Sequence, residues 1–248
     1  MSLRKTIKAL LPSPMVEAIR RYRTVDSYKR FRDPSAETVF SKVYASGIWG
    51  NSNDPEQPFF SGTGSHDQRI VQPYIEAMQA FLSTMADRPD VVDLGCGDFF
   101  VGCGIRNLCN KYVACDVVPA LIAFNRKQYK ALDVDFRVLD ITNDALPKAD
   151  IAIIRQVLQH LSNEQILQAL PRILSTYKYI ILTEHLPARE GFEPNVDKPA
   201  GPDIRLGIDS GIVLTRPPFS IPFIEQRTIC QVEESGSLIV TTVFRLKA

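Results

Sequence analysis

The chain has 248 residues, of which 45% are hydrophobic, and its formal net charge is +1. That length and composition are enough for one sizeable core. A nearly neutral charge gives no electrostatic reason to expect a nucleic-acid partner. No run is long and apolar enough to predict a membrane-spanning helix, so we expect a cytoplasmic protein.

The five cysteines show neither a C-x-x-C pair nor a zinc-binding spacing. They are Cys96, Cys103, Cys109, Cys115 and Cys230. This pattern indicates reduced, mostly buried thiols. Asp197, Asp203 and Asp209 are the nearest approach to a metal-binding set, but their spacing is not diagnostic. We therefore predict no metal site.

Residues 1–33 are more basic than the rest of the chain, with nine Lys or Arg against three Asp or Glu. Apolar residues recur there at helical spacing, so the segment has the pattern of a basic amphipathic helix. Such a helix binds weakly to anionic membrane surfaces. The alternative, which we favour, is a helix packed on its own domain with a solvated basic face. Pro12 and Pro14 argue against a signal peptide.

Two more helices are predicted before the first strand. Residues 36–50 suggest a short helix ending near Gly47, and residues 59–68 form a loop leading into a longer helix. Ser65 is the expected cap of that longer helix. Its apolar face comprises Ile70, Tyr74, Ile75, Met78 and Leu82.

From residue 91 the pattern alternates between strands and helices. The predicted strands are 91–95, 111–116, 134–140, 149–154 and 178–185, and the predicted helices are 99–110, 118–131 and 162–175. Pro119 suits a helix start, and the run from Ser162 to Gln165 suits a helix cap. Alternation of this kind predicts a parallel sheet covered by helices on both faces.

The end of the chain breaks this rhythm. Residues 186–222 are rich in Pro and Gly and predict a long functional loop. Two strands follow, 223–230 and 237–247, and their short connection requires antiparallel pairing. The expected fold class is therefore α/β, with a Rossmann-like, seven-stranded, mostly parallel sheet and an antiparallel C-terminal hairpin.

The stretch VVDLGCGDFF, residues 91–100, places a glycine turn directly after the first predicted strand of this sheet. Ligands of open parallel sheets bind beyond the carboxyl ends of the strands, where this turn lies. A dinucleotide turn needs a third glycine at position 100, which is Phe. Asp93 and Asp98 would repel a pyrophosphate and suit a ligand that carries a positive charge.

This combination resembles motif I of the class I S-adenosylmethionine-dependent methyltransferases. The resemblance continues with Asp116 after the second strand, with Asp140-Ile141 after the third and with RQVLQHLSNEQI (155–166) after the fourth. It covers about residues 85–248. It implies S-adenosylmethionine as cofactor and S-adenosylhomocysteine as product.

The resemblance also implies a set of cofactor-binding residues. They are Gly62, Gly64, Ser65, Asp93, Gly95, Gly97, Asp98, Asp116, Val117, Asp140, Ile141, Arg155 and Gln156. In this interpretation Asp116 binds the ribose hydroxyls, and the loop SGTGS (61–65) closes over the cofactor carboxylate. For Asp140 an alternative is equally good, namely that its side chain caps a turn with Thr142.

A finer resemblance concerns a subgroup of these enzymes that we associate with bacterial polysaccharide and glycolipid gene clusters. It rests on W-G (49–50), SGTGS (61–65), N-x-D (195–197), Arg205 and PPF (217–219). The subgroup often has Trp before the Arg, where this chain has Ile204. This resemblance makes Asn195, Asp197 and Arg205 substrate-binding candidates, and His66 is a further candidate because it lies in the loop beside SGTGS.

The functional hypothesis is O-methylation of a sugar, a glycan or another small hydroxylated acceptor. His160 and His185 are the candidate bases, and the residues leave the choice between them open. We expect residues 1–84 to form a helical cap and cofactor-covering loop, and residues 85–248 to form the core, with 186–222 as an acceptor-side insertion. Two alternatives are a nicotinamide-dependent oxidoreductase and a non-catalytic adenosyl-binding module.

Overall fold

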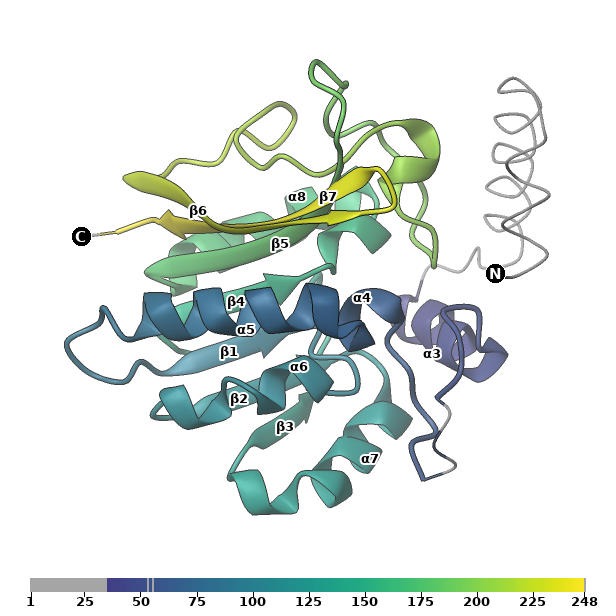
Figure 1. The fold of residues 1–248 in the computed structure, drawn as a ribbon, viewed down its shortest axis with the longest axis vertical. Coiled ribbons are helices and arrows are strands. Elements are labelled where there is room, and N and C mark those ends of the chain that lie inside the picture. Colours follow the sequence, from purple (N-terminus) through teal and green to yellow (C-terminus); the bar gives the residue numbers. More distant parts are fainter. Residues whose placement is uncertain (1–34, 53, 55, 248) are drawn as a thin grey trace.

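A computed structural model describes residues 35–52, 54 and 56–247, so the predicted N-terminal basic helix lies outside the described residues. The described chain forms a seven-stranded sheet in the order β3-β2-β1-β4-β5-β7-β6 (Figure 1). The strands are β1 (Val91–Leu94), β2 (Tyr112–Asp116), β3 (Asp135–Val138), β4 (Ile151–Arg155), β5 (Tyr179–Pro187), β6 (Glu225–Glu234) and β7 (Ser237–Arg245).

Strands β1 to β5 pair in parallel, whereas β7 runs antiparallel between β5 and β6. The predicted fold class is thereby confirmed. The turn between β6 and β7 places Ser235 and Gly236 at φ values of +51° and +81°. Such a tight turn leaves no room for a helix, which is why the last two strands form a hairpin.

The helices cover both faces of this sheet. The α-helices are α3 (Ala36–Ser46), α4 (Thr63–His66), α5 (Gln68–Leu82), α6 (Phe100–Cys103), α7 (Pro119–Gln128) and α8 (Asn163–Thr176). The 3-10 helices are η1 (Arg106–Leu108), η2 (Lys130–Leu132), η3 (Leu158–His160) and η4 (Arg205–Ile208).

Side chains alternate along β1 between two apolar layers. Val91 packs with Met78 of α5, whereas Val92 packs with Ile166 of α8. In Figure 1, α5 lies in front of the sheet and α8 lies behind it. Every residue of β1 is buried, as expected for a central parallel strand with both faces covered.

Several predicted helix ends are confirmed. Ser162 accepts a hydrogen bond from the Gln165 backbone N–H, and the Gln165 side chain returns one, so α8 begins with a capping box. Pro119 occupies the first turn of α7. Gly47 ends α3 at a φ of +60°, a left-handed conformation that favours glycine.

Two local predictions are wrong. The cap of α5 is Asp67, whose carboxylate accepts from the Arg69 backbone N–H at 2.9 Å, while Ser65 lies within the short helix α4. The predicted helix 99–110 is broken into α6 and η1. Gly102 and Gly104 lie at that break, and glycine lowers helix stability.

The segment between β5 and β6, residues 188–224, contains only the short helix η4 and is otherwise irregular. It lies beside η3, because the Gly201 backbone N–H donates to the His160 carbonyl at 3.0 Å. Within the described residues, no helix has both the length and the apolar character needed to cross a bilayer.

Candidate active site

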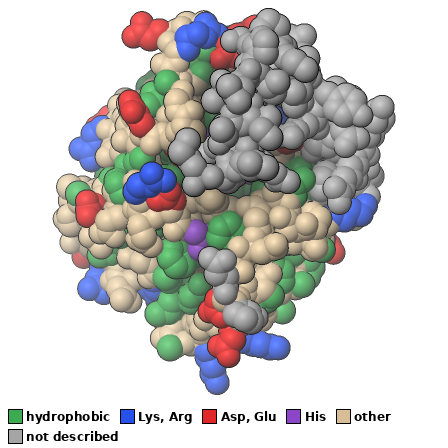
Figure 2. Space-filling model, turned by 45° about the vertical axis from the view of Figure 1, so that its right-hand side comes forward, with side chains coloured by type: hydrophobic (Ala, Val, Ile, Leu, Met, Phe, Trp, Pro, Cys, Tyr) green, Lys and Arg blue, Asp and Glu red, His purple; other side chains and the backbone are tan. Residues whose placement is uncertain are grey.

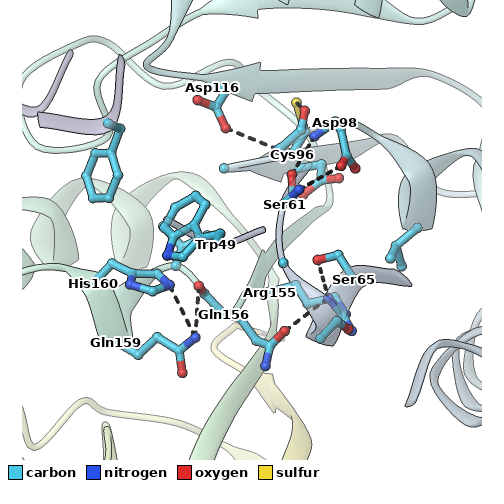
Figure 3. Close-up of a pocket in the computed structure, with 18 of the residues that line it drawn as sticks. Trp49, Ser61, Ser65, Cys96, Asp98, Asp116, Arg155, Gln156, Gln159 and His160 are labelled. Atoms are coloured by element: carbon cyan, nitrogen blue, oxygen red, sulfur yellow. Dashed lines mark hydrogen bonds between the residues drawn. The ribbon is translucent and has the colours of Figure 1, made fainter. Parts of the chain in front are cut away.

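A cavity of about 510 Å³ lies beyond the carboxyl ends of β1, β2 and β4, and we call it the strand-end pocket (Figure 3). Its volume falls within the roughly 300–1,000 Å³ typical of small-molecule sites. All thirteen predicted cofactor-binding residues line it, as do His160 and His185. The sequence therefore located the pocket, and the geometry below describes how each group is held.

The turn after β1 brings the backbone against the end of β2. Gly95 and Gly97 adopt φ values of +85° and +54°. The Gly97 backbone N–H donates to one Asp116 carboxylate oxygen and the Val118 N–H to the other, both at 3.1 Å. Asp116 is thus fixed in orientation, and its remaining lone pairs are available to a ligand. Burial raises its pKa to about 6.

Asp93 is the next-to-last residue of the buried strand β1 and also lines the pocket. The Tyr112 hydroxyl donates to its carboxylate at 3.0 Å. Burial raises the pKa of Asp93 to about 7, and the Tyr112 hydrogen bond and the Arg155 charge oppose that increase. A carboxyl with such a pKa is poised to ionise when a cation enters the pocket.

Asp98 fastens the loop 61–66 onto the turn. Its carboxylate accepts from the Ser61 backbone N–H at 2.8 Å and from the His66 Nε2 at 2.7 Å. The Asp98 backbone N–H in turn donates to the Ser61 hydroxyl at 2.9 Å. The Tyr44 hydroxyl of α3 lies 3.0 Å from that same hydroxyl. We call these hydrogen bonds the latch. They connect Tyr44 and the loop 61–66 to the turn after β1.

Arg155 fastens the same loop from the end of β4. Its guanidinium donates to the Gly64 carbonyl at 2.6 Å and to the Ser65 hydroxyl at 3.3 Å, and it lies over the Tyr74 ring at 5.0 Å. Gln156 follows with a φ of +56°, which turns its backbone into the pocket mouth. A strained backbone at a site is often tied to function.

The Asp140 carboxylate caps a turn, as the alternative interpretation supposed. It accepts from the Thr142 backbone N–H at 2.8 Å, from the Thr142 hydroxyl at 2.6 Å and from the Asn143 amide at 3.0 Å. Asp140 and Ile141 still line the pocket, so the turn presents its backbone and an apolar side chain there.

The opposite wall of the pocket is aromatic. The Trp49 and His160 rings lie 5.0 Å apart between centroids, and Phe40 and Tyr44 lie beside Trp49. The Trp49 indole N–H donates to the Pro202 carbonyl at 3.1 Å. Figure 3 shows Trp49, His160 and Gln159 grouped apart from Asp116 and Asp98. The pocket therefore has a carboxylate side and an aromatic side.

The protonation of the His160 ring follows from its partner. Its Nδ1 lies 3.2 Å from the Gly201 carbonyl, which can only accept, so Nδ1 carries the proton and Nε2 keeps a lone pair. Burial lowers the pKa of His160 to about 3. The ring is therefore neutral at pH 7 and acts there as a hydrogen-bond acceptor.

His185 lines the same pocket from β5. Its Nε2 lies 2.7 Å from the Ser237 hydroxyl and 3.5 Å from a Glu234 carboxylate oxygen. Burial lowers its pKa, and the Glu234 charge opposes that decrease. Both candidate bases thus reach the pocket, His160 from η3 and His185 from β5.

The four predicted substrate-binding residues do not line the pocket. The His66 ring is stacked between Phe60 and Phe100, at 4.4 and 4.6 Å. The Asn195 side chain donates to three carbonyls of its own loop, those of Val213, Arg216 and Pro217.

Asp197 and Arg205 likewise form hydrogen bonds mostly with backbone groups. Asp197 accepts from the N–H groups of Asn163 and Lys198, while Arg205 is fully buried against the turn that carries His160. In this structure these residues organise the segment 188–224 instead of facing the pocket.

Sequence reasoning missed several lining residues. They are Phe40, Tyr44, Trp49, Cys96, Gln159, Asp203 and Glu234. Phe40 and Tyr44 share one face of α3 at a spacing of four residues, a signal that fits any buried helix face equally well. Asp203 and Glu234 come from irregular or hairpin segments, where the pattern carries no positional information.

Positive charge is sparse around the pocket. Arg155 is the single Lys or Arg among the described residues that line it. On the face shown in Figure 2, charged side chains lie mostly around the rim, and a histidine reaches the surface among hydrophobic and uncharged groups. Within the part of the chain that the structure describes, no cluster of three or more His, Cys, Asp or Glu is arranged to hold a metal ion.

Comparison with known proteins agrees with this geometry. Residues 92–178 match a family model described as a methyltransferase domain. No curated protein matches the chain in sequence. Among solved structures, the N-methyltransferase NodS from Bradyrhizobium japonicum WM9, in complex with S-adenosylhomocysteine, is 14% identical, with a TM-score of 0.51 over 72% of this chain and 88% of that chain.

Two further structures share the fold. Magnesium protoporphyrin IX methyltransferase from Synechocystis PCC 6803, with bound S-adenosylmethionine, is 14% identical, with a TM-score of 0.50 over 83% of this chain and 91% of that one. The N-terminal domain of EvdMO1, crystallised in the presence of S-adenosylhomocysteine and D-fucose, is 14% identical, with a TM-score of 0.51 over 71% and 84% of the two chains.

The pocket fits S-adenosylmethionine in both size and chemistry. Its buried carboxylates suit a ligand with a sulfonium and an ammonium group, whereas they would repel the pyrophosphate of a nicotinamide dinucleotide. The matched domain, the seven-stranded fold and this donor set agree. The chain carries a methyltransferase domain at residues 92–178 and has the fold of S-adenosylmethionine-dependent methyltransferases.

Proposed function

We propose that the protein methylates a hydroxyl group of a neutral sugar or a similar small, hydroxylated acceptor. The observation that carries this proposal is the aromatic side of the strand-end pocket, where Trp49 and the neutral His160 ring lie side by side. Flat aromatic faces bind the apolar faces of sugar rings, and a neutral imidazole accepts a hydroxyl hydrogen bond.

The carboxylate side would hold the cofactor. Asp116 is oriented by two backbone N–H groups and accepts the ribose hydroxyls. Gly64 and Ser65 lie in the loop that faces the amino-acid end, with Asp93 below it, and Ile141 supplies an apolar contact for the adenine. This assignment leaves the aromatic side free for the acceptor.

The bound cofactor supplies an electrophilic methyl group on a sulfonium. The remaining work belongs to the protein and consists of alignment and proton handling. Alignment of two reactants can supply roughly 7–11 kcal/mol in the best intramolecular cases. Trp49 and Gln159 would fix the acceptor. The His160 Nε2, which the Gln159 amide approaches at 3.4 Å, would accept a hydrogen bond from the reacting hydroxyl and orient it, and the proton released on methyl transfer would pass to solvent.

The charge of the lining residues supports a neutral acceptor. Asp203 and Glu234 lie on the acceptor side, and the Arg155 guanidinium is already engaged by the loop 61–66. An anionic acceptor would meet these two carboxylates, and among the described residues no Lys or Arg besides Arg155 lines the pocket to balance them. A hydroxylated neutral molecule can instead donate hydrogen bonds to those carboxylates.

The test is a screen for acceptor-dependent release of S-adenosylhomocysteine, followed by mass spectrometry of the product. We expect turnover with neutral sugars and no turnover in an Asp116→Asn control. Trp49→Ala should raise the acceptor KM at least tenfold while leaving cofactor binding unchanged. Turnover confined to amines would contradict the proposal, and so would methylation at nitrogen or carbon.

A further inference from the structure

The turn that carries Gln159 and His160 is held by the irregular segment 188–224. The Arg205 guanidinium donates to the carbonyls of Leu158 and Gln159, both at 3.1 Å, and to that of Leu161 at 2.8 Å. The carbonyl of His160 accepts from the Gly201 backbone N–H at 3.0 Å. Each carbonyl from 158 to 161 therefore has a partner in that one segment.

Arg205 is committed to this task. Its side chain is fully buried, and its other N–H groups donate to the Val196 carbonyl at 3.2 Å and to the Asn163 side chain at 2.9 Å. Burying a guanidinium is costly unless its donors are satisfied, and the planar fork of arginine matches several carbonyls at once. Lysine, with one flexible ammonium group, cannot reproduce that geometry.

Glu184 of β5 lies on the other side of the same turn. Its side chain is buried, and the charge of Arg205 and the backbone N–H groups of Leu158 and Gln159 act on its carboxyl. Burial nevertheless raises the pKa of Glu184 to about 8. The turn is thus held at its carbonyls by Arg205 and flanked at its N–H groups by Glu184.

We propose that Arg205 is a positioning residue for methyl transfer, which acts by fixing the turn 158–161 so that Gln159 and the His160 ring face the acceptor side of the pocket. Arg205 itself does not line the pocket. This inference rests on the proposed acceptor side. Arg205, which the sequence predicted to bind substrate, would instead hold Gln159 and His160 in place.

The test uses the His160 ring as a reporter and needs no acceptor. The chain has three histidines, so their NMR signals can be assigned with single His→Asn variants. The charged groups acting on His160 are Lys198 and Arg205, while Gly201 and Asp203 act on it through backbone hydrogen bonds. Arg205→Lys keeps the charge at 205 and removes only the fork of donors. Arg189→Lys, at an exposed Arg in the same segment, is the matched control.

We expect the His160 signal of the wild type and of Arg189→Lys to show no titration between pH 5 and 8. In Arg205→Lys the loosened turn admits water, and the His160 midpoint should move up toward its ordinary value of 6.5. Affinity for S-adenosylhomocysteine should stay within threefold, which shows that the cofactor side is intact. An Arg205→Lys protein that binds cofactor but leaves His160 silent across that range would overturn the proposal.

A second measurement covers the case in which Arg205→Lys does not fold. In the wild type, the amides of His160, Leu161 and Gly201 should exchange with solvent as slowly as those of β4, because the turn is rigid. Exchange at rates typical of open loops would contradict the positioning role. Neither measurement uses an acceptor. Both therefore test the role of Arg205 even if the acceptor screen fails.

Discussion

The carboxyl edge of the sheet and the segment 188–224 both carry polar residues close to the pocket, but they use them in opposite ways. At the sheet edge, Asp93 and Asp116 are oriented by neighbouring donors and face the pocket. In the segment, Asn195 and Arg205 are buried and bonded to backbone carbonyls. We propose that the first set recognises a ligand, whereas the second satisfies backbone groups that have no partner in regular secondary structure.

The difference follows from how backbone groups are satisfied. Strands satisfy their own N–H and C=O groups through the ladder, so side chains at their ends are free to serve a ligand. A long irregular segment has no ladder, and its buried backbone groups need side-chain partners. Polar side chains in such a segment are therefore as informative about loop architecture as about substrate.

The strongest prediction concerns Asn195, whose amide bonds three carbonyls and whose oxygen accepts from the Val213 backbone N–H at 2.8 Å. Asn195→Ala should lower the free energy of unfolding by about 3 kcal/mol, because it leaves buried polar groups unsatisfied. Chemical denaturation measures this. Cofactor affinity should remain unchanged, and exposed Asn107→Ala is the matched control.

An Asn195→Ala protein of normal stability that had lost only acceptor turnover would assign Asn195 to substrate binding. The polar residues of the segment 188–224 would then serve a ligand, as those at the sheet edge are proposed to do.

The next prediction tests the latch at the sheet edge. Asp98→Ala removes the carboxylate that accepts from the Ser61 N–H and from His66. Hydrogen bonds to charged groups contribute about 1.5–3 kcal/mol, so cofactor affinity should fall roughly 10- to 100-fold. Calorimetric titration measures the loss. Exposed Asp135→Ala on β3 should bind as the wild type does, and equal affinity in both variants would exclude a latch.

A pH experiment sharpens the account of the carboxylates. Burial raises the pKa of Asp93 to about 7 and that of Asp116 to about 6, above their ordinary value of 3.8. A cationic ligand favours the ionised forms, so binding should release protons at pH 6 and far fewer at pH 8. Calorimetry in two buffers of different ionisation enthalpy counts them. Proton uptake at pH 6 would contradict the assignment.

The same pKa shifts determine how the free energy of unfolding of the ligand-free protein changes with pH. For an acid whose pKa is raised on folding, the stabilising contribution is present below its unfolded pKa and is lost as the pH rises through its folded pKa. The free energy of unfolding should therefore lose the contribution of these two groups between about pH 4 and pH 7. Asp93→Asn should flatten that slope.

The smallest effect is expected at Asp140, whose carboxylate is engaged by Thr142 and Asn143. Asp140→Asn keeps one acceptor oxygen for that turn, so cofactor affinity should change less than threefold in calorimetric titration. A loss comparable to that of Asp98→Ala would show that the carboxylate contacts the ligand directly.

The sequence predicted the sheet and the grouping of the strand-end residues at one pocket, because both follow from periodic patterns. Strand ends are visible in the sequence, and parallel strands bring their carboxyl ends to one edge, so Asp93 and Asp116 were placed together. The aromatic side could not be predicted in this way. Trp49 and Pro202 meet through one hydrogen bond between residues 153 positions apart, and no local pattern encodes that contact.

Arg205 shows the limit of motif transfer. The resemblance predicted that Arg205 binds substrate. In the structure its side chain is fully buried and does not line the pocket. Burial and partner identity decide between those roles, and neither is readable from one sequence. The break of the predicted helix 99–110 is different, since Gly102 and Gly104 are visible in the sequence and lower helix stability there.

The most direct test of the central claim is a calorimetric titration of the wild type and Asp116→Asn with S-adenosylmethionine, S-adenosylhomocysteine and NADH. We expect the first two ligands to bind the wild type, NADH to show no binding, and Asp116→Asn to weaken both at least tenfold. Binding of NADH alone, or equal affinity of the two proteins for S-adenosylhomocysteine, would contradict the placement of the cofactor at the carboxyl ends of β1 and β2.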